Sequence, residues 1–127
     1  MHADQFLFRH PRRIAAALIA LTLAAATAVL WTHTSPGWWV LLLFGLGPDI
    51  AGLLSIERGL DRGQMSPRAV PVYNLLHRPV VPIVLGGLAA ASLVPAALLV
   101  GALVWGFHIA LDRTLGYGLR TPDGRQR

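Results

Sequence analysis

The sequence contains no cysteine and no lysine, and it carries few charged residues of either sign. The absence of cysteine excludes disulfides, thiolate nucleophiles and cysteine-ligated zinc. The Walker loop, the G-x-S-x-G turn of serine hydrolases and the dinucleotide fingerprint are also missing. Only 13% of the 127 residues are charged and 54% are hydrophobic, whereas soluble domains carry about 25% charged residues. This composition is typical of a membrane protein, and residues 1–127 are expected to form a single integral membrane domain.

Long apolar runs make up most of the chain. A helix needs about 20 apolar residues to cross roughly 30 Å of hydrocarbon. The first run, 14–30, is longer than the roughly 7 to 15 residues of a secretory signal core, so we expect a span rather than a cleaved leader. Pro79 and Pro82 lack an N–H and are expected to kink the third helix. The sequence thus predicts an all-α bundle of four transmembrane helices, at about 14–31, 38–56, 70–91 and 93–115.

Arginine supplies all eleven basic residues, and its distribution indicates a topology. Cytoplasmic flanks of membrane helices collect positive charge. Ten of the eleven arginines lie before the first predicted helix, between the second and third, or at and beyond the end of the last, all on one side of a four-pass chain. We therefore expect cytoplasmic tails at 1–13 and 116–127, and an inner-membrane location. In so apolar a chain the net charge of +5 indicates contact with anionic lipid head groups rather than with nucleic acid.

Ionisable residues are rare inside the predicted spans and gather at one depth. Asp49, His77 and His108 each lie about seven residues from the cytoplasmic end of their helix, roughly 10 Å at 1.5 Å per residue. Asp112 shares a helix face with His108, because residues four apart are neighbours. Such groups usually face the bundle interior and pair there. We expect a polar cluster in the cytoplasmic half of the bundle, with Arg78 and Arg113 as charge partners. The candidate members are Asp49, Tyr73, Asn74, His77, His108 and Asp112.

Three functions remain open for this cluster. The first, which the sequence favours, is a buried hydrogen-bonded network that stabilises the bundle and has no known activity. The second is a site for a divalent metal such as zinc, which could support hydrolysis. The third is a path for protons or ions. The sequence names no reaction, and the H-x-x-x-D spacing alone is not diagnostic. The candidate metal ligands are His77, His108, Asp49 and Asp112.

Three motifs resemble a known family. "GPDI" at 47–50, "VYNLLH" at 72–77 and "HIALDRTLGYGLR" at 108–120 are similar, in this order, to the small bacterial integral membrane proteins known as domain of unknown function 4260. The resemblance covers residues 12–122. It implies a four-helix membrane protein and implies no activity. The residues on the family pattern are Asp49, Tyr73, Asn74, His77, His108, Asp112, Arg113, Gly116, Tyr117 and Gly118.

Overall fold

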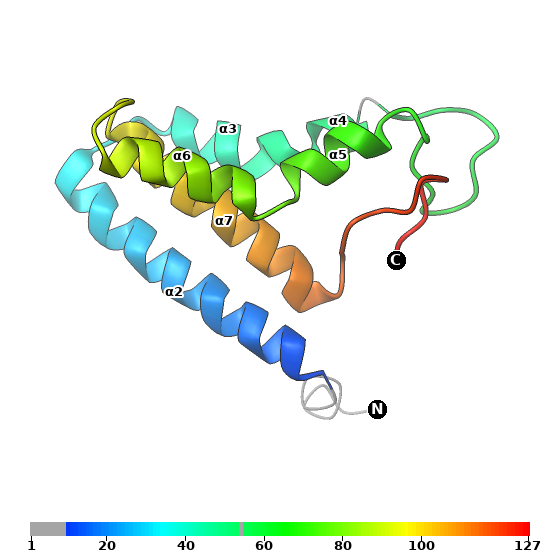
Figure 1. Ribbon diagram of the computed structural model, residues 1–127, viewed down its shortest axis with the longest axis horizontal. Coiled ribbons are helices and arrows are strands. Elements are labelled where there is room, and N and C mark those ends of the chain that lie inside the picture. The colour runs from blue at the N-terminus through cyan, green and yellow to red at the C-terminus, as the bar shows by residue number, and fades with distance from the viewer. Residues whose placement is uncertain (1–9, 54) are drawn as a thin grey trace.

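The computed structural model describes residues 10–53 and 55–127, and in this part of the chain the regular structure is helical, as predicted. One isolated antiparallel bridge joins Arg120 to Gln126 near the C-terminus. The predicted N-terminal tail at 1–13 lies mostly outside the described residues. The elements, labelled in Figure 1, are α2 (Pro11–Thr34), α3 (Trp39–Leu46), the 3-10 turn η1 (Gly47–Asp49), α4 (Ile50–Leu53), α5 (Val70–Leu76), α6 (Val80–Ala90) and α7 (Ala97–Leu115).

Helix α7 is the centre of the structure. It packs against α2 on one side and against α3 and α6 on the other, and Figure 1 shows it between these two layers. Val100 and Val104 of α7 bury against Val40 of α3, with Trp31 and Phe44 packed around them. Helix α7 therefore has three other helices as neighbours.

The helices have the length and composition of membrane spans to different degrees. Two, α2 and α7, are long and apolar enough to cross a membrane, and the bent pair α5 and α6 passes the same test when counted as one span. The apolar segment Trp39–Leu53 is shorter. Many large apolar side chains are exposed, including Leu21, Ile83 and Leu93. The described chain thus has two to three candidate spans and an apolar surface suited to lipid, while a four-span bundle stays a prediction.

The second predicted helix, 38–56, is not continuous. It divides into α3, η1 and α4, and its helical part ends at Leu53. Pro48 lies inside η1 and has no N–H for an α-helical hydrogen bond, which favours the tighter turn at this point. The prediction of an unbroken helix was wrong here because it followed hydropathy and ignored Pro48. The break sets the direction of Asp49, the last residue of η1.

The third predicted helix bends, as expected, but at Pro79 alone. The axes of α5 and α6 differ by 46° across the break at residues 77–79. Pro82 lies in the first turn of α6, where a backbone N–H has no partner within the helix. Its missing N–H therefore removes no helical hydrogen bond and does not kink the helix. The carbonyl of Leu75 accepts from the N–H of Arg78, and the carbonyl of Arg78 accepts from Val81, both at 3.2 Å. The break therefore leaves His77 between two helices with its neighbouring backbone satisfied.

The start of α7 differs from the predicted range of 93–115, whereas its end agrees with it. The helix begins at Ala97, after a turn in which Ser92 has a left-handed backbone with φ of 61°. It ends at Leu115, where Gly116 adopts φ of 94° and reverses the chain. Glycine is the residue most often found where a helix ends in a left-handed backbone conformation, as Gly116 does. The segment 117–127, here called the C-terminal strap, then passes α5 at Asn74 and reaches the loop that precedes α5 (Figure 1).

Candidate metal centre

Four side chains that are far apart in sequence converge at the middle of the molecule. Asp49 comes from η1, His77 from the break between α5 and α6, and His108 and Asp112 from α7. One nitrogen or oxygen atom from each lies within 4.8 Å of the others. Two of the four residues stand at helix breaks and two are one turn apart on a continuous helix. The breaks at Pro48 and Pro79 thus help direct Asp49 and His77 toward α7.

The two imidazoles are held in the same orientation by main-chain oxygens. Nδ1 of His77 lies 2.8 Å from the carbonyl oxygen of Tyr73, and Nδ1 of His108 lies 2.8 Å from that of Gly45. A carbonyl oxygen only accepts, so each Nδ1 must carry the hydrogen and donate it. In a neutral ring, Nε2 is then a bare acceptor. The two Nε2 atoms lie 3.3 Å apart, which brings two lone pairs together.

The carboxylates add further acceptors to the same point. Asp49 Oδ1 lies 3.2 Å from His77 Nε2 and 3.4 Å from His108 Nε2. Asp112 Oδ2 lies 3.4 Å and 3.5 Å from the same two nitrogens. Ligand atoms at about 2.0–2.1 Å from a tetrahedral zinc ion stand about 3.3–3.4 Å apart. The five close distances in the cluster therefore match the edges of a zinc coordination shell.

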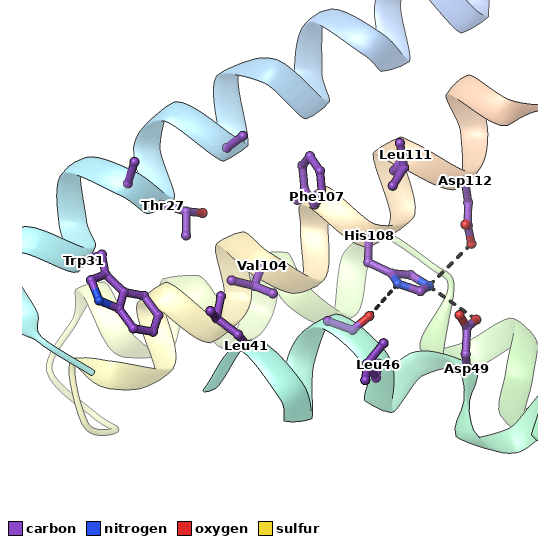
Figure 2. Close-up of a pocket in the computed structure, with 13 residues that line it drawn as sticks. Thr27, Trp31, Leu41, Leu46, Asp49, Val104, Phe107, His108, Leu111 and Asp112 are labelled. Atoms are coloured by element: carbon purple, nitrogen blue, oxygen red, sulfur yellow. Dashed lines mark hydrogen bonds and ion pairs between the residues drawn. The ribbon is translucent and has the colours of Figure 1, made fainter. Parts of the chain in front are cut away.

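The cluster is closed on one side and open on the other. The His77 side chain is fully buried, and those of His108 and Asp112 are 12% and 19% exposed. Asp49 is 52% exposed. Asp49, His108 and Asp112 line one end of a groove of about 670 Å³, and Figure 2 shows them pointing toward one another there. Access to the cluster is therefore from the groove, past Asp49.

Comparison with known families accounts for the motifs. The family model described as domain of unknown function (DUF4260) matches residues 13–127. The chain belongs to this family. No curated protein and no solved structure matches it. The resemblance noted for residues 12–122 is thereby confirmed, and the DUF4260 match reaches the end of the strap.

Other residues of the DUF4260 motifs surround His77 rather than join the cluster. The Tyr73 ring stacks on the His77 ring with centroids 3.9 Å apart, and the Arg120 guanidinium lies 5.5 Å from the Tyr73 centroid. Arg113 donates to the carbonyl oxygens of His77, at 3.1 Å, and Tyr117, at 3.0 Å. These contacts fix the ring and backbone of His77. Tyr73 and Arg113 are therefore suited to positioning His77 as a metal ligand.

The predicted charge partners do not pair with the cluster. Among the described residues, neither Arg113 nor Arg78 forms an ion pair with Asp49 or Asp112, and Arg78 is exposed. The helical repeat places Gly45 one turn before Asp49 on the same helix face. What the sequence does not predict is the role of the Gly45 carbonyl oxygen, which orients His108, because a backbone acceptor has no side-chain signature.

Asn74 ties the C-terminal strap to α5. Its side-chain amide donates to the carbonyl of Arg120 at 2.9 Å and accepts from the N–H of Arg120 at 2.7 Å. The strap is also held where Met65 N–H donates to Gly124 O at 2.9 Å and where Arg125 pairs with Asp61 at 2.5 Å. The segment predicted as a cytoplasmic tail is therefore folded against the helices, and Asn74 is engaged with it.

Replacing Asn74 is expected to release the strap. Asn74→Leu removes both hydrogen bonds, and at about 1 kcal/mol each the attachment should weaken by about 2 kcal/mol. Amide hydrogen exchange in peptides covering 118–127 should accelerate roughly thirtyfold. Gln126→Ala is the control, because it removes one exposed 3.3 Å contact to Gly118. Unchanged exchange in Asn74→Leu would contradict this role.

Proposed function

We propose that this protein is a membrane-embedded metalloprotein that holds one divalent ion, with zinc the best fit, in the His/Asp cluster. The observation that supports this most strongly is the approach of two Nδ1-anchored imidazoles to 3.3 Å between their Nε2 atoms. A single bridging proton would satisfy one pair among the five close contacts, whereas a divalent ion satisfies all four side chains. The anchoring of both rings by carbonyl oxygens also fits a metal site, because ligating histidines almost always donate their other ring N–H to such a partner.

The open side of the cluster favours a reactive metal over a purely structural one. Structural zinc sites are enclosed, while catalytic sites keep a position for water or substrate. We propose that His77, His108 and Asp112 stay bound and that Asp49, the most exposed of the four, shares its position with water. A divalent ion lowers the pKa of bound water to about 7 and so supports hydrolysis at neutral pH. The Asp49 carboxylate is placed to accept the proton that such water loses.

The membrane arrangement that we propose has four passes and both termini in the cytoplasm. The distribution of arginines supports it. The short segment Trp39–Leu53 would then be a fourth, broken crossing beside α2, α7 and the bent pair. In this arrangement the protein lies in the bacterial inner membrane, the cluster lies in its cytoplasmic half, and the flanking arginines contact anionic head groups.

Metal content tests the proposal directly. Protein purified in detergent, without chelator or histidine tag, is expected to contain about one zinc or similar ion per chain by mass spectrometry. The double variant His77→Ala/His108→Ala should contain none, because it removes both imidazole ligands. His33→Ala is the matched control, since His33 is exposed near the end of α2 and bonds only to its own helix and to Thr32. A metal-free wild type after supply of zinc would refute the site.

A further inference from the structure

The groove that ends at the cluster identifies the class of substrate. We propose that the site hydrolyses a neutral carboxylic ester of a lipid, with the lipid chain in the groove and the ester at the metal. This inference rests on the proposed metal site. It follows from the lining of the groove, its length and its charge.

Away from the cluster the lining is mostly apolar. Ala24 and Ala28 of α2, Leu41 of α3, and Val104 and Phe107 of α7 form its walls, as Figure 2 shows for the labelled side chains. The hydroxyl of Thr27 is already bonded to the carbonyl oxygen of Leu23 at 2.7 Å. Apart from the indole N–H of Trp31, such a surface offers a polar substrate few partners along its length, whereas a hydrocarbon chain fits it.

The length of the groove suits a chain with its head at the cluster. Val104 and Asp112 both line it, and these residues are separated by about 12 Å along α7 at 1.5 Å per residue. Trp31 and Leu41 line it too, whereas all its ionisable lining residues belong to the cluster. A lipid chain lying along the groove therefore brings its polar group to the cluster.

Charge decides which polar group reacts. The cluster holds two carboxylates, and a divalent ion with two neutral imidazoles would bring its net charge to zero. No arginine is among the residues that line the groove. A phosphoester would bring a negative charge to this neutral cluster with no further cation on the groove lining to balance it, whereas a neutral carboxylic ester brings none. The chemistry thus favours a carboxylic ester over a phosphoester.

The reaction needs only water as a second reactant. A water molecule held at the cluster gives a proton to the carboxylate of Asp49 while its oxygen forms a bond to the ester carbonyl carbon. The bond from that carbon to the alcohol oxygen then breaks. The alcohol oxygen takes the proton from Asp49, which leaves a carboxylic acid and an alcohol with no change of oxidation state.

Two esters and two variants test this inference in proteoliposomes loaded with zinc. The probes are p-nitrophenyl acetate and p-nitrophenyl octanoate, and the variants are Ala28→Phe and Ala25→Phe. Ala28 lines the groove, while its neighbour Ala25 is exposed on the same helix and is absent from the lining. We expect wild type and Ala25→Phe to prefer octanoate at least tenfold in kcat/KM. Ala28→Phe should lose that preference through a fall in kcat/KM for octanoate and should retain its metal, because the phenyl ring fills the groove away from the ligands.

The outcomes separate the two proposals. Equal octanoate preference in Ala28→Phe and Ala25→Phe would overturn the groove as the chain site and leave the metal-dependent hydrolase intact. Bound metal with no hydrolysis of either ester would overturn the ester substrate alone. Absence of metal in wild type would refute the proposed function and this inference with it. If Ala28→Phe does not fold, Leu41→Trp, which fills the same groove from α3, replaces it.

Discussion

His77→Ala is expected to abolish metal binding and to lower the melting temperature of the protein in detergent. His77 is fully buried and its Nε2 approaches three other members of the cluster. Loss of its side chain leaves a cavity, for which core truncations suggest a cost of roughly 3 kcal/mol in the free energy of unfolding. It also removes any stabilisation by metal. An ion at about 100 times its dissociation constant contributes about 2.7 kcal/mol.

Differential scanning fluorimetry with and without chelator separates these two losses. Chelator should lower the melting temperature of wild type and of His33→Ala, and should leave that of His77→Ala unchanged. Added zinc should restore only the first two. If chelator changes none of the three, the cluster is a hydrogen-bonded network stabilised by protons, and the metal assignment is wrong.

Gly101→Ala is expected to separate α3 from α7 and so to weaken both the fold and the cluster. A Cβ at Gly101 would lie 2.6 Å from two ring carbons of Phe44, closer than packed atoms tolerate. Overpacking of this kind costs roughly 1–3 kcal/mol, which exceeds the gain of about 1 kcal/mol from placing alanine in a helix. Because α3 carries the carbonyl of Gly45 that orients His108, the shift should also reduce zinc affinity.

Gly87→Ala is the matched control for this prediction. Gly87 is also helical, but a Cβ there meets nothing within 4 Å. The Gly87→Ala variant should gain helix propensity without overpacking. It should therefore melt at or above the wild-type melting temperature and bind zinc with unchanged affinity. Thermal melts and zinc titrations of both variants give the comparison. Equal behaviour of the two alanine variants would mean that Phe44 moves aside at no cost.

The association of the four ionisable residues could be predicted because charge is so rare in these helices. Once the apolar runs were identified, the distances of Asp49, His77 and His108 from the helix ends brought them to one level. The helical repeat then added Asp112, because it lies four residues after His108 on the same helix face. The structure brings these four side chains together without any assumption about function. Scarcity of ionisable residues made this part of the sequence informative.

The contacts of Asn74 and the division of the second helix were not predicted, for physical reasons. Asn74 and Arg120 are 46 residues apart and pair through the backbone of Arg120, so neither side chain signals the contact. Hydropathy predicts burial in lipid but is insensitive to a missing N–H, which is why Pro48 was overlooked. Backbone hydrogen bonding, rather than side-chain chemistry, decided both features.

In the proposed four-pass arrangement, the short apolar segment from Trp39 to Leu53 has a consequence for the lipid around it. At about 1.5 Å per residue it covers roughly 22 Å, whereas the hydrocarbon layer is about 30 Å thick. A hydrophobic segment shorter than the layer thins the bilayer beside it. Asp49 lies within this segment, only about 6 Å from its Leu53 end. The membrane would then be thinnest where the cluster opens, so interfacial water and lipid head groups would come down to a site that would otherwise be dry.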